Sequence, residues 1–208
     1  MIDKSSIKQT MCVNCANGGF HQEQSLNEGL LNKDWVNFMK QTGVMDDNAV
    51  TFHISKDIPH QHTKFINRTI KKIDRNLDIN VRRTCNTDVA DILIDDKLNY
   101  DSFGPDYSDA LGLAYIDETN YKPNATWLTS TYMYDRFNKK GKVRLGKITK
   151  HVIVHEMLHT MGLSHPFGVG NYEGVDNSDT VMSYNFNDFS LKHPMRGADV
   201  NALQSLWN

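Results

Sequence analysis

Five residues in one short segment have the types and the spacing needed for metal chemistry: His155, Glu156, His159, Gly162 and His165. An α-helix has about 3.6 residues per turn, so His155 and His159 would lie one turn apart on the same face and reach one ion. Gly162 tolerates the left-handed conformation, so the helix is expected to end there and the chain to turn back, bringing His165 in as a third ligand. Three neutral imidazoles that leave a fourth position open are typical of catalytic zinc.

Glu156 directly follows the first of these histidines and is expected to lie beside the open position. There it would act as general base and then as general acid, taking a proton from the attacking water and passing it to the leaving amine. Zinc would lower the pKa of that water toward about 7 and polarise the carbonyl group under attack. The segment is expected to be a buried helix, because it has an apolar side: Ile148, Val152, Ile153, Met157, Leu158 and Met161.

Two further helices are expected before this segment. Residues 22–41 carry apolar side chains near helical spacing, and Gly43 would end that helix. A second helix is predicted after residue 54, with Ser55 or Asp57 as its cap and Pro59 in its first turn. Its apolar stripe has the spacing of a helix face that is directed toward a core: Ile66, Ile70, Ile73 and Leu77.

Short apolar runs predict the strands. Val50, Phe52 and Ile54 alternate with polar residues, which is typical of a strand with one buried face. Four more runs are separated by clusters of Asn, Asp, Gly and Pro: residues 78–82, 89–94, 111–116 and 125–133. A strand, a helix and more strands before the metal-binding helix indicate an α/β (α+β) domain, with the helices covering one face of a sheet.

The composition restricts the class of protein. The 208 residues include 23 Lys+Arg and 25 Asp+Glu, for a formal net charge of -2, which argues against a nucleic-acid binder. No run approaches the roughly 18 apolar residues of a membrane span. The three cysteines cannot form a disulfide framework. The basic segment 136–150 is expected to be a solvated hairpin tip, with a phosphate-binding or membrane-surface patch as the alternative.

The histidine motif resembles that of the metzincin metallopeptidases, His-Glu-x-x-His-x-x-Gly-x-x-His followed by a methionine turn. The turn is matched by Thr180-Val181-Met182-Ser183-Tyr184, and residues 163–166 and 197–204 are most similar to the serralysin and matrixin branch. The resemblance covers residues 48–208. It implies a metzincin-like catalytic domain, with a mixed twisted sheet, two long helices, a zinc cleft and a small C-terminal subdomain.

The resemblance also implies roles for residues outside the motif. Tyr184 matches a tyrosine that acts as an extra zinc ligand and swings away to stabilise the oxyanion, whereas in matrixins a tyrosine near this point is structural. Met182 would lie beneath the metal. Residues 111–116 match the edge strand that pairs with an extended substrate. Residues 185–193 would form the wall of a specificity pocket, and three of them would line it or belong to the lower core: Phe186, Phe189 and Leu191.

The other residues that could do chemistry have simpler interpretations. Four histidines are expected to be ordinary surface or core residues: His53, His60, His62 and His151. Structural calcium could bind near residues 95–109 or 176–188, where polar loops are the simpler interpretation. Cys12 and Cys15 form C-x-x-C without a second pair, so a surface pair is expected, and a thiolate that blocks the zinc to cause latency is the alternative.

These features predict two parts of the chain. Residues 1–47 would be an N-terminal extension, either a propeptide or an accessory segment, and residues 48–208 a zinc peptidase domain. The expected activity is that of a monomeric zinc metalloendopeptidase acting on extended proteins or peptides. The alternatives are a zinc-dependent binding or structural protein without peptidase activity, and an amidase of cell-wall peptides. Because metzincins mostly work outside the cell, secretion is expected, although residues 1–20 lack the apolar stretch of a signal peptide.

Overall fold

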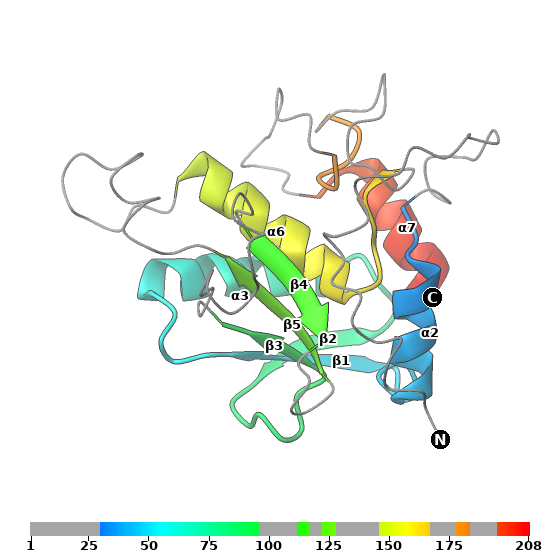
Figure 1. The fold of residues 1–208 in the computed structure, drawn as a ribbon, viewed down its shortest axis with the longest axis horizontal. Helices are drawn as coiled ribbons and strands as arrows, with labels where there is room; N and C mark the ends of the chain where they lie inside the picture. Colours follow the sequence, from blue (N-terminus) through cyan, green and yellow to red (C-terminus); the bar gives the residue numbers. More distant parts are fainter. Residues whose placement is uncertain (1–29, 96–111, 117–121, 128–145, 167–177, 184–194) are drawn as a thin grey trace, which may run out of the picture.

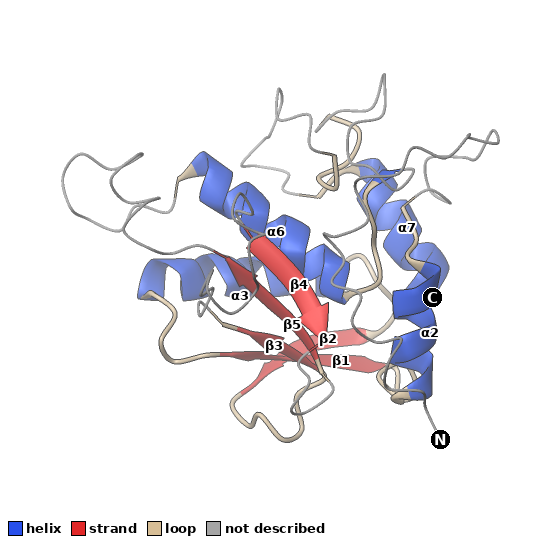
Figure 2. Cartoon of the chain, viewed as in Figure 1, coloured by secondary structure: helices blue, strands red, loops and turns tan. Residues whose placement is uncertain are grey.

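The structure, a computed structural model, describes residues 30–95, 112–116, 122–127, 146–166, 178–183 and 195–208. Figures 1 and 2 show these residues as a sheet with helices packed on it. The strands are β1 (Ala49–Ile54), β2 (Asn80–Thr84), β3 (Ile92–Ile94), β4 (Gly112–Ile116) and β5 (Pro123–Trp127). The helices are α2 (Lys33–Gln41), α3 (His60–Asp74), α6 (Lys147–Thr160) and α7 (Gly197–Trp207).

The five strands form one mixed sheet in the order β2-β1-β3-β5-β4. β1 is parallel to β2 and β3, and β3 is parallel to β5, whereas β4 runs antiparallel to β5. The parallel neighbours β1 and β2 are joined through α3, which is a βαβ connection. The predicted mixed α/β class is therefore confirmed. β4 is an edge strand among the described strands, and it lies beside α6 (Figure 1).

The alternating side chains of the sheet build the core. In the register, Phe52 pairs with Ile92 and Ile54 with Ile94, and these four side chains are buried. The predicted stripe is buried with them, with Ile66, Ile70 and Ile73 on α3 and Leu77 three residues after its end at Asp74. Burial of such side chains stabilises the fold by about 1.5–3 kcal/mol each, so this core fixes where α3 and α6 lie.

The predicted start of α3 is wrong in its detail. Pro59 is the cap residue, without a side-chain hydrogen bond, and the helix begins at His60. Ser55 and Asp57 do not cap it, because they bond to each other in the preceding turn, where the Asp57 N–H donates to Ser55 Oγ at 3.3 Å. The strand boundaries also shift by two or three residues: β2 starts at Asn80, β3 at Ile92 and β5 at Pro123. A proline is tolerated as the first residue of a strand.

The N-terminal helix is shorter than predicted within the described residues. α2 begins after Asn32, whose side-chain oxygen accepts a hydrogen bond from the Trp35 N–H at 3.0 Å. Residues 30–32 are not helical, and residues 22–29 lie outside the described part of the chain. Leu30, Trp35 and Met39 belong to the main core cluster. From residue 30 onward the predicted extension is thus packed into the domain, while the domain boundary at residue 48 stays a prediction.

Candidate metal centre

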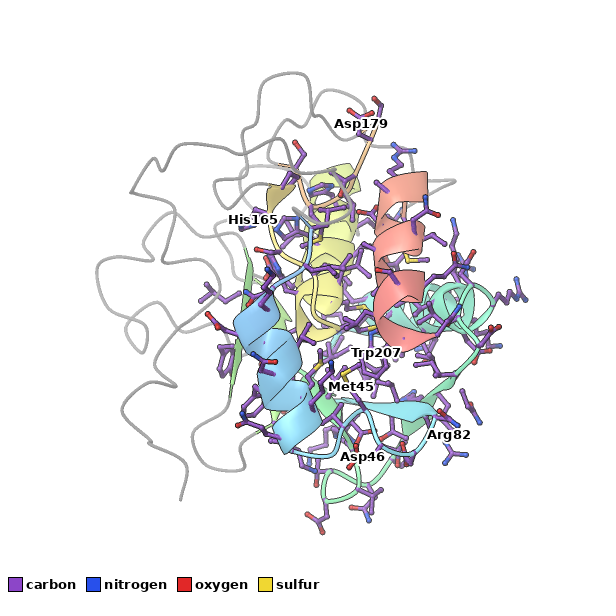
Figure 3. The ribbon with its side chains drawn as sticks, turned by 90° about the vertical axis from the view of Figure 1, so that its right-hand side faces the viewer. Met45, Asp46, Arg82, His165, Asp179 and Trp207 are labelled. Carbon is purple, nitrogen blue, oxygen red and sulfur yellow. The ribbon has the colours of Figure 1, made fainter. Side chains whose placement is uncertain are left out.

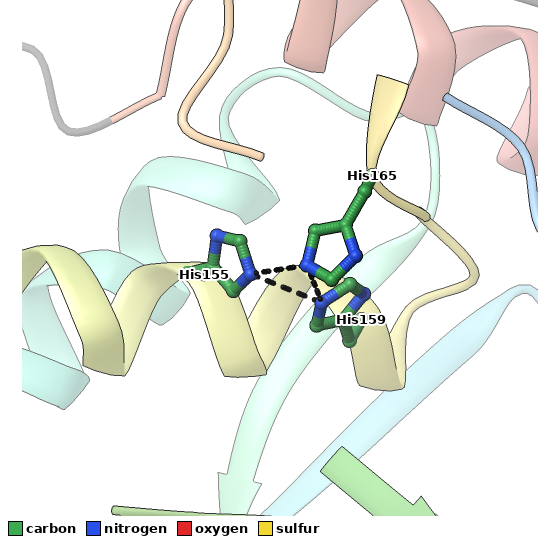
Figure 4. A group of neighbouring side chains, drawn as sticks. All are labelled: His155, His159 and His165. Carbon is green, nitrogen blue, oxygen red and sulfur yellow. Dashed lines mark hydrogen bonds between the residues drawn. The ribbon is translucent and has the colours of Figure 1, made fainter. Parts of the chain in front are cut away.

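The three predicted ligands meet at one place in the structure (Figure 4). The Nε2 atoms lie 3.0 Å apart in His155 and His165, 3.1 Å apart in His155 and His159, and 3.2 Å apart in His159 and His165. Two nitrogen ligands on a tetrahedral zinc, with bonds of about 2.0–2.1 Å, lie about 3.3 Å apart, so one ion of that size fits. The structure therefore brings together three buried histidines that could hold a metal ion.

A tight turn at the end of α6 brings the third histidine back. Gly162 N–H donates to the His159 carbonyl oxygen at 3.0 Å, and Leu163 N–H donates to the Leu158 carbonyl oxygen at 3.1 Å. This pair of hydrogen bonds defines a Schellman motif, which requires a positive φ at the residue after the cap. Gly162 has a φ of +100°, as the sequence predicted for a glycine at this position.

Backbone carbonyl groups orient two of the imidazoles. The Nδ1 atom of His155 lies 2.9 Å from the Val181 carbonyl oxygen, and the Nδ1 atom of His159 lies 2.8 Å from the Leu163 carbonyl oxygen. A carbonyl oxygen can only accept, so each Nδ1 carries the proton and each Nε2 presents a lone pair. Histidines that bind a metal usually donate their other ring N–H to a partner of this kind, which fixes the orientation of the ring.

The same tautomers provide a test of whether a cation fits. The Nε2 lone pairs of His155 and His159 point toward one another across 3.1 Å, and both rings are buried. Two facing lone pairs repel each other, whereas a cation between them is attracted to both. The donor set is all nitrogen, which suits zinc and other transition ions better than calcium or magnesium. The described residues are therefore compatible with zinc.

Burial keeps these rings neutral. It lowers the pKa of His155 to about 4, against the effect of the Val181 carbonyl, and it lowers the pKa of His159 and of His165 well below the usual value. Metal ligands must be deprotonated, and a histidine that is already neutral at pH 7 loses no proton on binding. All three imidazoles are thus neutral, as metal binding requires, over the physiological pH range.

Glu156 lies on α6 beside the first ligand and is buried, with 4% of its surface exposed. Its Oε2 atom has no hydrogen-bond partner among the described residues. Burial raises the pKa of this carboxyl well above its usual range, and a nearby cation would lower it again. Gly112 of β4 lies against this side chain, since a Cβ atom added to Gly112 would be 2.8 Å from Glu156 Oε1. The edge strand therefore approaches the carboxylate as closely as a glycine allows.

Asp199 supports the site from α7, and sequence analysis missed it. Its carboxylate accepts hydrogen bonds from Thr180 Oγ1, from the Val181 N–H at 3.1 Å and from the Arg196 N–H at 2.7 Å. Because Val181 also supplies the carbonyl that orients His155, Asp199 fixes that carbonyl in place. The signal that could have found it is an acid in the first turn of α7, where its side chain can accept the N–H of the cap residue.

Asp199 gives a testable pH dependence. Burial raises its pKa to about 6, although hydrogen bonds from Thr180, Arg196 and Val181 oppose the shift. The folded state then binds this proton more tightly than the unfolded state, so the free energy of unfolding rises as pH falls through about 6 toward about 4. Relative to Asp199→Asn, metal-free wild type should gain about 1–3 kcal/mol of stability between pH 7.5 and pH 4.5.

Urea unfolding of both metal-free proteins across this pH range measures that gain. The comparison with the variant is needed because His62 and His151, whose pKa values burial lowers to about 4 and about 3, change stability in the opposite direction in both proteins. Parallel pH profiles of wild type and variant would show that the carboxyl of Asp199 does not titrate in this range.

Gly162→Ala is expected to lower the free energy of unfolding by about 1–3 kcal/mol, because the φ of +100° strains any side chain. The added Cβ would also lie 2.7 Å from Leu206 Cδ2 and 2.9 Å from Met39 Cε. Gly197→Ala is the matched control, since no atom lies within 4 Å of its added Cβ, and alanine there should be neutral or stabilising by up to about 1 kcal/mol. Equal urea midpoints for the two variants would contradict the role of Gly162.

Four of the six other histidines lie within the described residues, and none of these four belongs to the three-histidine cluster. His62 and His151 are buried, His53 is half-buried and His60 is exposed. The ring of His151 lies 5.7 Å from that of His155, centroid to centroid. Within the described ranges, the three-histidine cluster is the one group of side chains that could hold a metal. Met182 is fully buried, and its N–H donates to Thr180 Oγ1 at 3.0 Å, while its place beneath the metal stays a prediction.

Several predictions concern residues outside the described ranges. They include Tyr184, the pocket wall at 185–193 with Phe186, Phe189 and Leu191, and the pair Cys12 and Cys15. Most of the basic segment 136–150 and of the candidate calcium segments 95–109 and 176–188 also lies there. These stay predictions.

Comparisons with known proteins do not assign the chain to a family. No family model matches it, and no curated protein matches it significantly. None of the helices in the described residues has the length and apolar character to cross a membrane. The class that fold and site define is thus a mixed α/β protein with a buried three-histidine site that could hold a metal ion.

Proposed function

We propose that this protein is a zinc-dependent endopeptidase of the metzincin type. The observation that carries the proposal is the convergence of His155, His159 and His165, with the buried carboxylate of Glu156 beside them. Three imidazoles leave a fourth position open for water and substrate, which distinguishes catalytic zinc from structural zinc. A purely structural site has no use for a buried carboxylate that lacks a hydrogen-bond partner among the described residues.

His155, His159 and His165 would hold the zinc. When bound, zinc lowers the pKa of water toward about 7 and polarises the carbonyl group of the substrate. Glu156 takes a proton from the water as its oxygen adds to the carbonyl carbon. As the C–N bond breaks, Glu156 gives that proton to the departing nitrogen, so the products are a carboxylic acid and an amine. Burial raises the pKa of Glu156 and a bound cation would lower it again, and a pKa near the operating pH suits a group to both transfers.

The substrate would lie in an extended conformation along β4. This strand is at the edge of the described sheet, and its first residue, Gly112, contacts Glu156. Pairing through backbone groups would bring a peptide bond beside the carboxylate without selecting a sequence. Such a mode of binding fits proteins or peptides as substrates, and we expect the protein to act outside the cell as a monomer.

Digestion of an unfolded protein mixture tests the proposal. The zinc-loaded protein is incubated with the mixture, and new termini are mapped by mass spectrometry. We expect cleavage that stops when a chelator removes zinc and returns when zinc is added back. No new termini, or cleavage that continues after zinc is removed, would contradict the proposed function.

A further inference from the structure

We propose that residues 30–42, which precede the histidine motif by more than a hundred positions in the sequence, are a positioning element of the metal centre. This inference rests on the metal-binding part of the proposed function and does not depend on the reaction. The contacts of this segment converge on residues 160–164, the turn that joins α6 to His165. In Figure 3, α2 and α7 stand on either side of α6, with His165 at its edge.

A short antiparallel bridge holds the turn from one side. Leu31 pairs with Leu163. The Asn32 N–H donates to the Gly162 carbonyl oxygen at 3.0 Å, and the Ser164 N–H donates to the Leu30 carbonyl oxygen at 2.6 Å. Leu30 and Gly162, whose carbonyl oxygens accept these two hydrogen bonds, are buried, so both acceptors are shielded from competing water.

This bridge acts on two of the three ligands. Leu163 supplies the carbonyl oxygen that accepts the proton of His159 Nδ1 at 2.8 Å and so sets the tautomer and orientation of that ring. Ser164 directly precedes His165, so fixing its N–H fixes where His165 leaves the turn. When a group that hydrogen-bonds to a metal-binding histidine is lost, metal affinity falls by about 10- to 100-fold.

Two tryptophan side chains donate hydrogen bonds to carbonyl oxygens at the C-terminal end of α6. The Trp35 indole N–H donates to the Thr160 carbonyl oxygen at 3.3 Å, and the Trp207 indole N–H donates to the Met161 carbonyl oxygen at 3.0 Å. The last carbonyls of a helix have no partner within the helix, and these indoles supply one. Trp35 lies on α2 and Trp207 on α7, so two helices far apart in the sequence donate hydrogen bonds to the turn at residues 160–164.

Substitutions at Asn32 isolate the bridge from general stability. Asn32→Pro removes the N–H that bonds to Gly162, and the φ of -90° at this position is near the range that proline allows. It also removes the side-chain cap of α2, which Asn32→Ala removes while keeping the N–H. The difference between these two variants therefore reports the bond to the turn. Trp35→Phe tests the indole bond, with Ile73→Val of α3 as a control for loss of core packing.

The experiment measures zinc affinity by competition with a chelator, and the absorption spectrum of the cobalt-substituted full chain. We expect Asn32→Pro to bind zinc about tenfold more weakly than Asn32→Ala, and Trp35→Phe about tenfold more weakly than Ile73→Val. The cobalt spectra of Asn32→Pro and Trp35→Phe should shift toward that of His165→Ala, while both controls keep the wild-type spectrum.

Two results would overturn the inference and are distinct from each other. If wild type binds zinc but each test variant binds it within twofold of its control, the segment has no positioning role and the proposed function stands. If wild type itself binds no zinc or cobalt, the proposed metal site is wrong, and the inference about residues 30–42 is wrong with it. Should Asn32→Pro fail to fold, the comparison of Trp35→Phe with Ile73→Val decides alone.

Discussion

Replacing Glu156 with glutamine is expected to slow peptide hydrolysis by about 10³- to 10⁴-fold, because a general base and acid contributes about 10²- to 10⁴-fold and this residue serves in both steps. Glutamine has nearly the same shape, so it fills the buried position without opening a cavity. It cannot take a proton at neutral pH. Zinc affinity should stay within about tenfold of wild type, because Glu156 is not one of the three ligands.

Initial rates on a fluorogenic peptide, with the zinc content of each sample measured in parallel, check this expectation. Gly112→Ala is a milder variant for comparison, because its added Cβ would lie 2.5 Å from Val152 Cγ1, 2.7 Å from Glu156 Cγ and 2.8 Å from Glu156 Oε1, so both side chains must shift. It displaces the carboxylate without removing it and should lower the rate by about 10- to 100-fold. A Glu156→Gln protein with zinc bound and the wild-type rate would exclude the proposed general base.

Replacing His159 with alanine is expected to weaken zinc binding by about 10²- to 10³-fold. Structural zinc sites with four ligands bind with about 10–16 kcal/mol in total, so one ligand contributes about 2.5–4 kcal/mol. His159 is fully buried and lies 3.1 Å and 3.2 Å from the two other Nε2 atoms. Its loss also leaves the Leu163 carbonyl without the Nδ1 donor.

Chelator competition on wild type, His159→Ala and His60→Ala measures this effect. His60 is an exposed histidine at the start of α3, so its replacement controls for non-specific binding to histidine. Circular dichroism shows whether each protein is folded before metal is added. A folded His159→Ala protein that binds zinc as tightly as His60→Ala would remove the ligand assignment.

The convergence of the three histidines could be predicted from the sequence, because the residues that produce it are close together in the chain. His155 and His159 lie four positions apart, and an α-helix alone brings them to one face. Gly162 marks the end of the helix through a conformation that few other residues adopt. The apolar stripe of α3 and the alternation in β1 were equally clear, since each depends on a period within one element.

The supports of the metal centre were not predictable, because they join residues far apart in the chain. Trp35 bonds to Thr160 across 125 positions, and no pattern in a single sequence links them. Asp199 contacts Val181 from the next element, and its role depends on how α7 packs. Leu30, Trp35 and Met39 belong to the core, which the polar composition of residues 1–47 does not indicate, because their burial depends on packing against distant parts of the chain.

X-ray absorption at the zinc edge of the zinc-loaded full chain tests the central claim most directly. A catalytic site made by His155, His159 and His165 predicts three imidazole nitrogens and one water oxygen, all at about 2.0–2.1 Å from the metal. A sulfur neighbour at about 2.3 Å, or a shell of oxygens without imidazole scattering, would contradict a three-histidine centre with an open fourth position.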